Sequence, residues 1–127
     1  MPESFNLRAR IDSFKHAFRG VVVLVIGQHN ARLHLLATVL VVVCGWYFSI
    51  AALEWTALLL AIGGVWMAEA LNTAVEELAD AVHPEQHPSI RNAKDVAAAA
   101  VLLFAVCALL VGLVIFVPYI IGSQVVA

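Results

Sequence analysis

Three acidic residues and one amide recur at helical spacing in the middle of the chain. Glu69, Asn72, Glu76 and Asp80 stand at offsets of 0, 3, 7 and 11 residues. At about 100° per residue, these offsets project onto a stripe about 80° wide on one face of a helix. Carboxylate and amide oxygens on one face suit a hard divalent cation such as Mg²⁺, which often binds with a nucleotide phosphate. We refer to these four residues as the acidic stripe.

Glu69 directly follows the apolar stretch Trp55–Ala68. An ionisable group within a membrane costs about 2.5–3.5 kcal/mol on insertion scales, so such residues usually face a partner or a water-filled cavity. A carboxylate at the lipid boundary can accept a proton from an alcohol that arrives from the membrane. The alternative is a helix that leaves the membrane at Glu69 and presents a solvated acidic end. That alternative explains Glu77 and Asp80, but not why one face carries the stripe.

Lys94 and Asp95 open the next predicted helix, after a short turn marked by Pro84 and Pro88. The short turn makes the two helices antiparallel neighbours, so Lys94 should lie level with the Asp80 end of the acidic stripe. A lysine there can hold phosphate oxygens by charge. Carboxylates, a phosphate-binding cation and a boundary base are the parts of a phosphoryl-transfer site. The sequence has no Walker A motif and no protein-kinase HRD or DFG motif, which excludes those two kinase classes.

The composition indicates that a membrane protein carries these residues. Of 127 residues, 63% are hydrophobic and 13% charged, with a mean hydropathy of +0.95. Soluble domains are about 45–50% apolar and about 25% charged. The net charge of −2 gives no basic footprint, so a nucleic-acid-binding module is excluded. The length suits a single domain over 1–127, and the mixed polar start argues against a cleaved signal peptide.

Four helices are expected, which makes the fold class an all-α membrane protein. Aromatic and basic side chains alternate over about 3–27, and this pattern predicts an amphipathic helix in the membrane interface. Three spanning helices are predicted over 33–50, 55–82 and 91–121. Pro118 is expected to end or kink the last of them. His29 and His34 are expected at the membrane interface beside Arg32.

Basic residues are distributed unevenly between the predicted loops. Five lie before the first span and two between the second and third, whereas 51–54 and 122–127 have none. The positive-inside rule therefore places the N-terminus and the 83–92 loop in the cytoplasm and the C-terminus outside.

Four sequence motifs resemble the small prokaryotic diacylglycerol kinase/undecaprenol kinase family, over about residues 10–118. The most specific are E-x-x-N-T-A-x-E-x-x-x-D from Glu69 to Asp80 and A-K-D-x-A-x-A-A-V-L over 93–102. The segments S-F-K-H-A-F-x-G over 13–20 and N-A-R-L-H-L over 30–35 are similar to its N-terminal pattern. The second of these looks more like the undecaprenol kinase branch.

The resemblance implies a homotrimer in the bacterial cytoplasmic (inner) membrane, with composite sites between subunits. It also implies ATP- and Mg²⁺-dependent phosphorylation of a lipid alcohol, either diacylglycerol or undecaprenol. By position, Glu69 is similar to the general base and Glu76 to a metal ligand that also serves the nucleotide. The other residues matched to the nucleotide are His16, Gln28, Glu85, Gln86, His87, Lys94 and Asp95. Asn72, Asp80 and Arg32 are matched to the support of the substrate site.

Two positions depart from the family pattern. Gln28 stands where the family usually has a glutamate that joins Glu76 at the metal, and a neutral amide binds Mg²⁺ more weakly. His16 replaces a common tyrosine near the nucleotide. Gln28 leaves open a catalytically impaired member of the family. A non-enzymatic membrane protein that binds or conducts cations through the acidic stripe is the alternative from another class.

Overall fold

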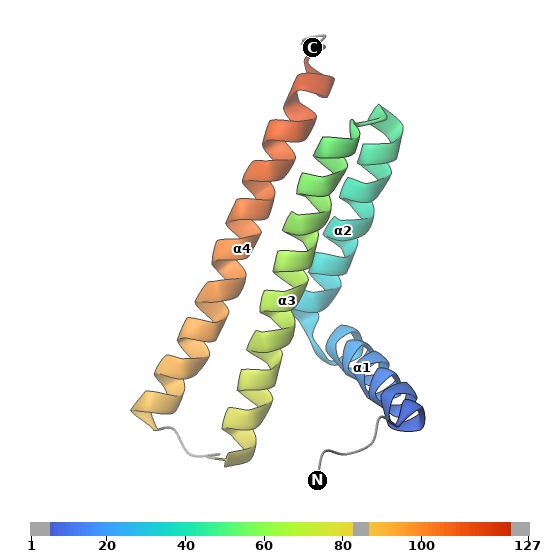
Figure 1. Cartoon of the computed structure of the whole chain (residues 1–127). Coiled ribbons are helices and arrows are strands. Elements are labelled where there is room, and N and C mark those ends of the chain that lie inside the picture. Colours follow the sequence, from blue (N-terminus) through green and yellow to red (C-terminus); the bar gives the residue numbers. More distant parts are fainter. Residues whose placement is uncertain (1–5, 83–86, 123–127) are drawn as a thin grey trace.

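The computed structural model describes residues 6–82 and 87–122, and this part of the chain is helical without strands. Its helices are α1 (Leu7–Gly27), α2 (His29–Phe48), α3 (Ala52–Val82) and α4 (Pro88–Ile120). Figure 1 shows α2, α3 and α4 running along a common direction, while α1 leaves one end of this bundle at an angle. The predicted all-α fold class is therefore confirmed.

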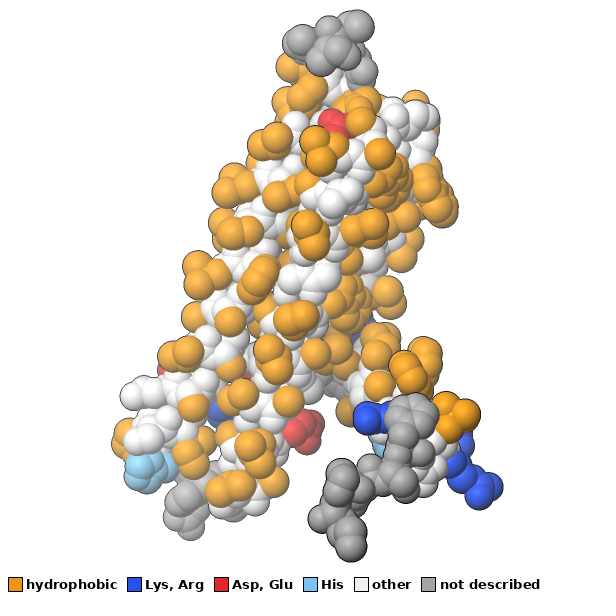
Figure 2. Space-filling view, viewed as in Figure 1, with side chains coloured by type: hydrophobic (Ala, Val, Ile, Leu, Met, Phe, Trp, Pro, Cys, Tyr) orange, Lys and Arg blue, Asp and Glu red, His pale blue; other side chains and the backbone are white. Residues whose placement is uncertain are grey.

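Helices α2, α3 and α4 are long and apolar enough to cross a membrane. Their 20, 31 and 33 residues correspond to about 30, 46 and 50 Å of helix. A hydrocarbon core about 30 Å thick is matched by α2 alone. Both α3 and α4 are therefore longer than one crossing of the membrane core requires, and the acidic stripe and Lys94 lie toward the same end of these two helices. In Figure 2, charged side chains gather at this end of an otherwise largely apolar surface.

The helix bounds differ from the predicted ones by a few residues. Both α2 and α3 begin earlier than expected, at His29 and Ala52, and α4 begins at Pro88. Proline suits the first helical turn, where its missing N–H would have no partner. The imidazole Nδ1 of His87 caps this end, accepting from the N–H of Ser89 at 3.2 Å. At the other end, α4 stops two residues after Pro118, close to the position where this proline was expected to end it.

A tight turn joins α2 to α3 at the end of the bundle away from the acidic stripe. Ser49 takes a left-handed conformation with φ of 51°, and its N–H donates to the carbonyl of Trp46. The N–H of Ile50 donates to the carbonyl of Gly45 at 3.1 Å, which completes the helix end. A Cβ atom on Gly45 would lie 2.7 Å from the Trp55 ring. Glycine therefore allows α2 and α3 to approach closely here.

The most extensive packing between helices is that of α3 against α4. Leu58 of α3 and Ile115 of α4 form a small buried core with Ile50 of the turn. Nearer the polar end, Gly64 lies against Phe104, whose ring would be 2.5 Å from a Cβ atom at that position. The two helices are thus held at a fixed separation on the approach to the acidic stripe.

One carboxylate lies at the end of the bundle away from the acidic stripe. Glu54 Oε2 accepts from the hydroxyl of Tyr119 at 2.6 Å and from the N–H of Ala51 at 2.7 Å. No sequence pattern predicts this pair, since 65 residues separate Glu54 from Tyr119. The contact ties the C-terminal end of α4 to the start of α3.

Substituting Tyr119 with phenylalanine should therefore destabilise the bundle. Loss of the hydrogen bond to the Glu54 carboxylate removes a contact between α4 and α3, so it should lower the midpoint temperature of thermal unfolding. Thermal unfolding in detergent would measure the change. Tyr47→Phe is the matched control, because Tyr47 lies at the same end of the bundle and is 80% exposed. Equal stability of the two variants would contradict the prediction.

Arg32 holds the junction between α1 and α2. Its Nε donates to the carbonyl of Val25 at 3.2 Å and its Nη2 to the carbonyl of Ile26. These carbonyls belong to the last turn of α1, where helix carbonyls lack partners within the helix. Arg32 was matched to the support of the substrate site. Within the described residues its guanidinium links the start of α2 to the end of α1, and its support of the substrate site stays a prediction.

Candidate active site

The first residues of the acidic stripe are buried inside the helix bundle. Glu69 is 1% exposed and Asn72 6%, and Thr73, which lies beside the stripe, is 8% exposed. Glu76 is half-buried, and Asp80 is exposed. The stripe therefore runs from the protein interior to solvent along α3. A solvated acidic helix end does not describe Glu69, which needs polar partners within the protein.

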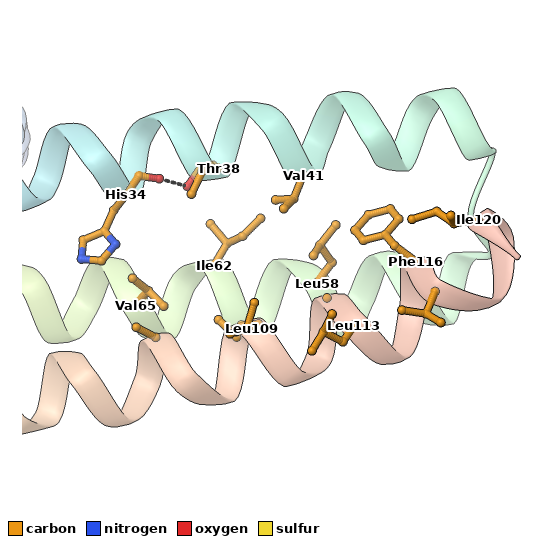
Figure 3. Close-up of a pocket in the computed structure, with 16 residues that line it drawn as sticks. His34, Thr38, Val41, Leu58, Ile62, Val65, Leu109, Leu113, Phe116 and Ile120 are labelled. Carbon is orange, nitrogen blue, oxygen red and sulfur yellow. Dashed lines mark hydrogen bonds between the residues drawn. The ribbon is translucent and has the colours of Figure 1, made fainter.

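A histidine on α2 lies close to Glu69. His34 Nε2 lies 3.6 Å from Glu69 Oε2, and the His34 side chain is 19% exposed. Glu69 Oε2 has no hydrogen-bond partner among the described residues. His34 was expected at the interface beside Arg32. Its side chain points from α2 toward α3 (Figure 3), where it lies against Glu69.

The next contact along the stripe joins Asn72 and Glu76. Asn72 Nδ2 donates to Glu76 Oε1 at 3.1 Å, which is the expected reach of an i, i+4 pair. Asn72 Oδ1 and Thr73 Oγ1 are buried without a hydrogen bond from any described residue. Buried polar atoms without a partner are uncommon and call for an explanation, such as an absent ion or ligand. Two oxygen atoms of α3 are therefore available to a ligand here.

The third contact crosses from α4 to α3. Lys94 Nζ donates to Asp80 Oδ1 at 2.8 Å, and the Lys94 side chain is 35% exposed. Lys94 thus lies level with the Asp80 end of the stripe, as the short turn predicted. An ammonium group has three N–H donors, so two remain for another ligand. Asp95 and His87 are exposed nearby in the chain, at the start of α4.

Some residues that were matched to the nucleotide site lie away from these contacts, and others lie outside the described residues. His16 is exposed on α1, and Gln28 is half-buried at the α1–α2 junction, where its N–H donates to the carbonyl of Leu24 at 3.0 Å. Glu85 and Gln86 lie outside the described residues. The structure thus brings the stripe together with His34 and Lys94.

The donor set suits Mg²⁺, although residues 6–82 and 87–122 contain no cluster of three or more histidine, cysteine or acidic side chains that could hold a metal. Mg²⁺ is usually bound by one or two carboxylates, with substrate phosphates and water completing its shell. The carboxylate of Glu76 and the unpartnered Oδ1 of Asn72 supply hard oxygen donors of this kind.

An apolar groove of about 440 Å³ runs along the bundle between α2, α3 and α4. Figure 3 shows His34 at one end of this groove, with Phe116 and Ile120 at the other. Between them the walls are aliphatic, with Thr38 as a further polar side chain. The groove therefore leads through the membrane-spanning part of the bundle to the neighbour of Glu69.

Two residues of the site were missed by sequence reasoning. Thr73 projects at about +40° from Glu69 on the helical wheel, directly beside the acidic stripe, so the projection could have included it. His34 carries no comparable signal, because its contact with Glu69 joins different helices 35 residues apart. Only the packing of α2 against α3 reveals it.

The fold and the site define a small multi-span membrane protein with a carboxylate-rich site at one end of its helices. Residues 15–116 match the prokaryotic diacylglycerol kinase family, and the chain belongs to this family.

Two named relatives are similar over most of the chain. An undecaprenol kinase of Bacillus subtilis is 40% identical over 106 residues, which cover 84% of this chain and 86% of the relative. A diacylglycerol kinase of a Synechocystis species is 36% identical over 107 residues, which cover 84% of this chain and 61% of that relative. Both matches agree with the family resemblance found in the sequence motifs.

Proposed function

We propose that this protein is a lipid kinase that transfers the γ-phosphoryl group of ATP to the hydroxyl of a membrane lipid alcohol. The observation that carries the proposal is Glu69, a carboxylate only 1% exposed, beside the end of an apolar groove. A base in this position can receive an alcohol from the membrane side. The names of both relatives support a lipid alcohol as acceptor.

The side chains divide the reaction between them along α3. Glu69 accepts the proton of the lipid hydroxyl as the alcohol oxygen bonds to the γ-phosphorus and the bond to ADP breaks. Asn72 orients Glu76 through their hydrogen bond. The two N–H groups that Lys94 does not use on Asp80 are available for phosphate oxygens. The proton acceptor thus lies on α3, and the phosphate-binding lysine lies on α4 beside the Asp80 end of the acidic stripe.

A Mg²⁺ ion would be held by Glu76 and Asn72 Oδ1. When bound, it would neutralise phosphate charge. Gln28 would add an amide oxygen where relatives in the family pattern supply a carboxylate. Asp95 and His87 at the start of α4 would contact the nucleotide, together with Glu85, Gln86 and His16. This part of the proposal rests on the motif match and on the chemistry of the side chains.

The protein is proposed to work as a homotrimer in the inner membrane of a bacterium. The N-terminus and the 83–92 loop would face the cytoplasm, where ATP is present, because the basic residues are concentrated there. Exposed Phe14 and Phe18 on α1 would enter the bilayer interface beside basic side chains of the same helix. A neighbouring subunit would complete the site and cover part of the apolar surface.

An acceptor panel tests the proposed function. Purified protein in detergent–lipid micelles receives ATP labelled at the γ-phosphate, Mg²⁺, and either diacylglycerol or undecaprenol. Label in the extracted lipid supports the lipid kinase, and the faster acceptor identifies the preferred alcohol. Transfer to neither alcohol, combined with binding of divalent cations, would overturn it in favour of the cation-binding alternative.

Narrowing the apolar groove should weaken the use of lipid while leaving the use of ATP unchanged. Gly112 lines the groove, and a Cβ atom there would meet no other atom within 4 Å. Gly112→Leu should raise KM for the lipid about tenfold, since the added carbon atoms occupy space that the hydrocarbon chain would bury.

The matched control for this variant is Gly63→Leu. Gly63 is exposed on α3, has the same open surroundings and does not line the groove. Its KM for lipid should equal that of the wild type. A trimer lost only in Gly112→Leu would show instead that a neighbouring subunit fills the groove, which contradicts the prediction.

A further inference from the structure

Two polar contacts join α2 to α3 about one helical turn apart. In the first, Trp66 Nε1 donates to Thr38 Oγ1 at 3.0 Å. The Thr38 hydroxyl in turn donates to the carbonyl of His34 at 2.7 Å, as Figure 3 shows. In the second, His34 Nε2 approaches Glu69 Oε2 to 3.6 Å. Because residues three and four apart are neighbours on a helix, the first contact fixes the turn of α2 that carries His34.

The buried carboxylate of Glu69 needs a hydrogen-bond donor beside it. Its Oε2 is buried and has no hydrogen-bond partner among the described residues, and a buried carboxylate oxygen is strongly unfavourable without one. His34 Nε2 is already close enough to count as an ionic contact. Catalytic hydrogen bonds are often long before the substrate binds and shorten in the productive complex. A shift of a few tenths of an ångström would bring the imidazole N–H within hydrogen-bond distance.

We propose that His34 is a positioning residue for Glu69. Its Nε2–H donates to Glu69 Oε2 in the complex with the acceptor, which fixes the carboxylate so that its other oxygen can take the proton of the lipid hydroxyl. The Trp66–Thr38 contact holds His34 in place for this role. His34 also lines the end of the apolar groove, so the hydroxyl of the acceptor passes it on the way to Glu69. The inference rests on the proposed lipid kinase reaction.

A pair of substitutions of similar size tests this role. His34→Gln keeps an N–H donor on a side chain of similar reach, whereas His34→Leu keeps the volume and removes the donor. We expect His34→Leu to lower kcat about 10- to 100-fold, the range found when a partner that orients a functional group is lost. KM for ATP should stay unchanged, and His34→Gln should stay within about threefold of the wild-type kcat because it restores the hydrogen bond.

The control is His29→Ala, which removes an exposed imidazole from the same helix and should leave the kinetics unchanged. Wild-type kcat in His34→Leu, or equal losses in the Leu and Gln variants, would overturn the inference. Inactive wild-type protein would instead refute the proposed function. If His34→Leu fails to assemble, Thr38→Val tests the same role, because it removes the hydroxyl that holds His34 in place. A kcat lowered about threefold to tenfold at constant KM for ATP supports the role. An unchanged kcat overturns it.

Discussion

Replacing Glu69 with glutamine should lower kcat for lipid phosphorylation by about 100- to 10,000-fold, the usual contribution of a positioned base. The side chain keeps its size and its place beside His34, but an amide cannot accept the proton of the alcohol. The fold and the KM for ATP should be preserved, since neither depends on the charge of this residue. Transfer of labelled phosphate to extracted lipid provides the measurement.

Glu69→Asp separates loss of the base from loss of packing. It retains a carboxylate that is one methylene short of its proper position, so its activity should fall between those of the wild type and Glu69→Gln. Full activity in Glu69→Gln would show that another group accepts the proton. The mechanism built on the buried carboxylate would then be wrong.

The second large effect is expected at Glu76. Glu76→Gln removes the charge that would hold a divalent cation while keeping an oxygen atom near Asn72. We expect kcat/KM for Mg·ATP to fall about 100- to 1,000-fold, as when one electrostatic contact to the reacting group is removed. The Mg²⁺ concentration for half-maximal activity should rise, and a Mg²⁺ titration of the initial rate would measure it.

Glu77→Gln is a close control for this substitution. Glu77 is the next residue of α3, is exposed and lies off the acidic stripe, so its removal changes the net charge equally without affecting the proposed ligand. Its Mg²⁺ titration should match that of the wild type. If both variants lost activity to the same extent, the effect would come from overall charge, and Glu76 would not be a ligand.

Local sequence patterns predicted much of the fold. Apolar length identified the three spanning helices, because a membrane core sets how many residues each must contain. The bounds were less accurate at helix starts such as Pro88, where the capping by His87 depends on its side-chain rotamer. The Glu54–Tyr119 hydrogen bond was not predictable, since it depends on how far α4 extends past the turn between α2 and α3.

Within the site, helical spacing and the short turn predicted the contacts along α3 and between α3 and α4, but not the contact between α2 and α3. Asn72 and Glu76 share one helix, so their hydrogen bond follows from the i, i+4 spacing alone. The Lys94–Asp80 contact was foreseen because a short turn fixes the register of α3 and α4. His34 was assigned to the membrane interface, because nothing in its neighbourhood of the sequence shows which face of α2 packs on α3.

The way in which Arg32 fastens α1 bears on how such a protein can evolve. Its guanidinium binds the carbonyls of Val25 and Ile26, which any amino acid at those positions would provide. The attachment of α1 to α2 therefore does not depend on which side chains α1 carries. Substitutions on the exposed surface of α1 can therefore accumulate while the helices that hold the carboxylates keep their arrangement.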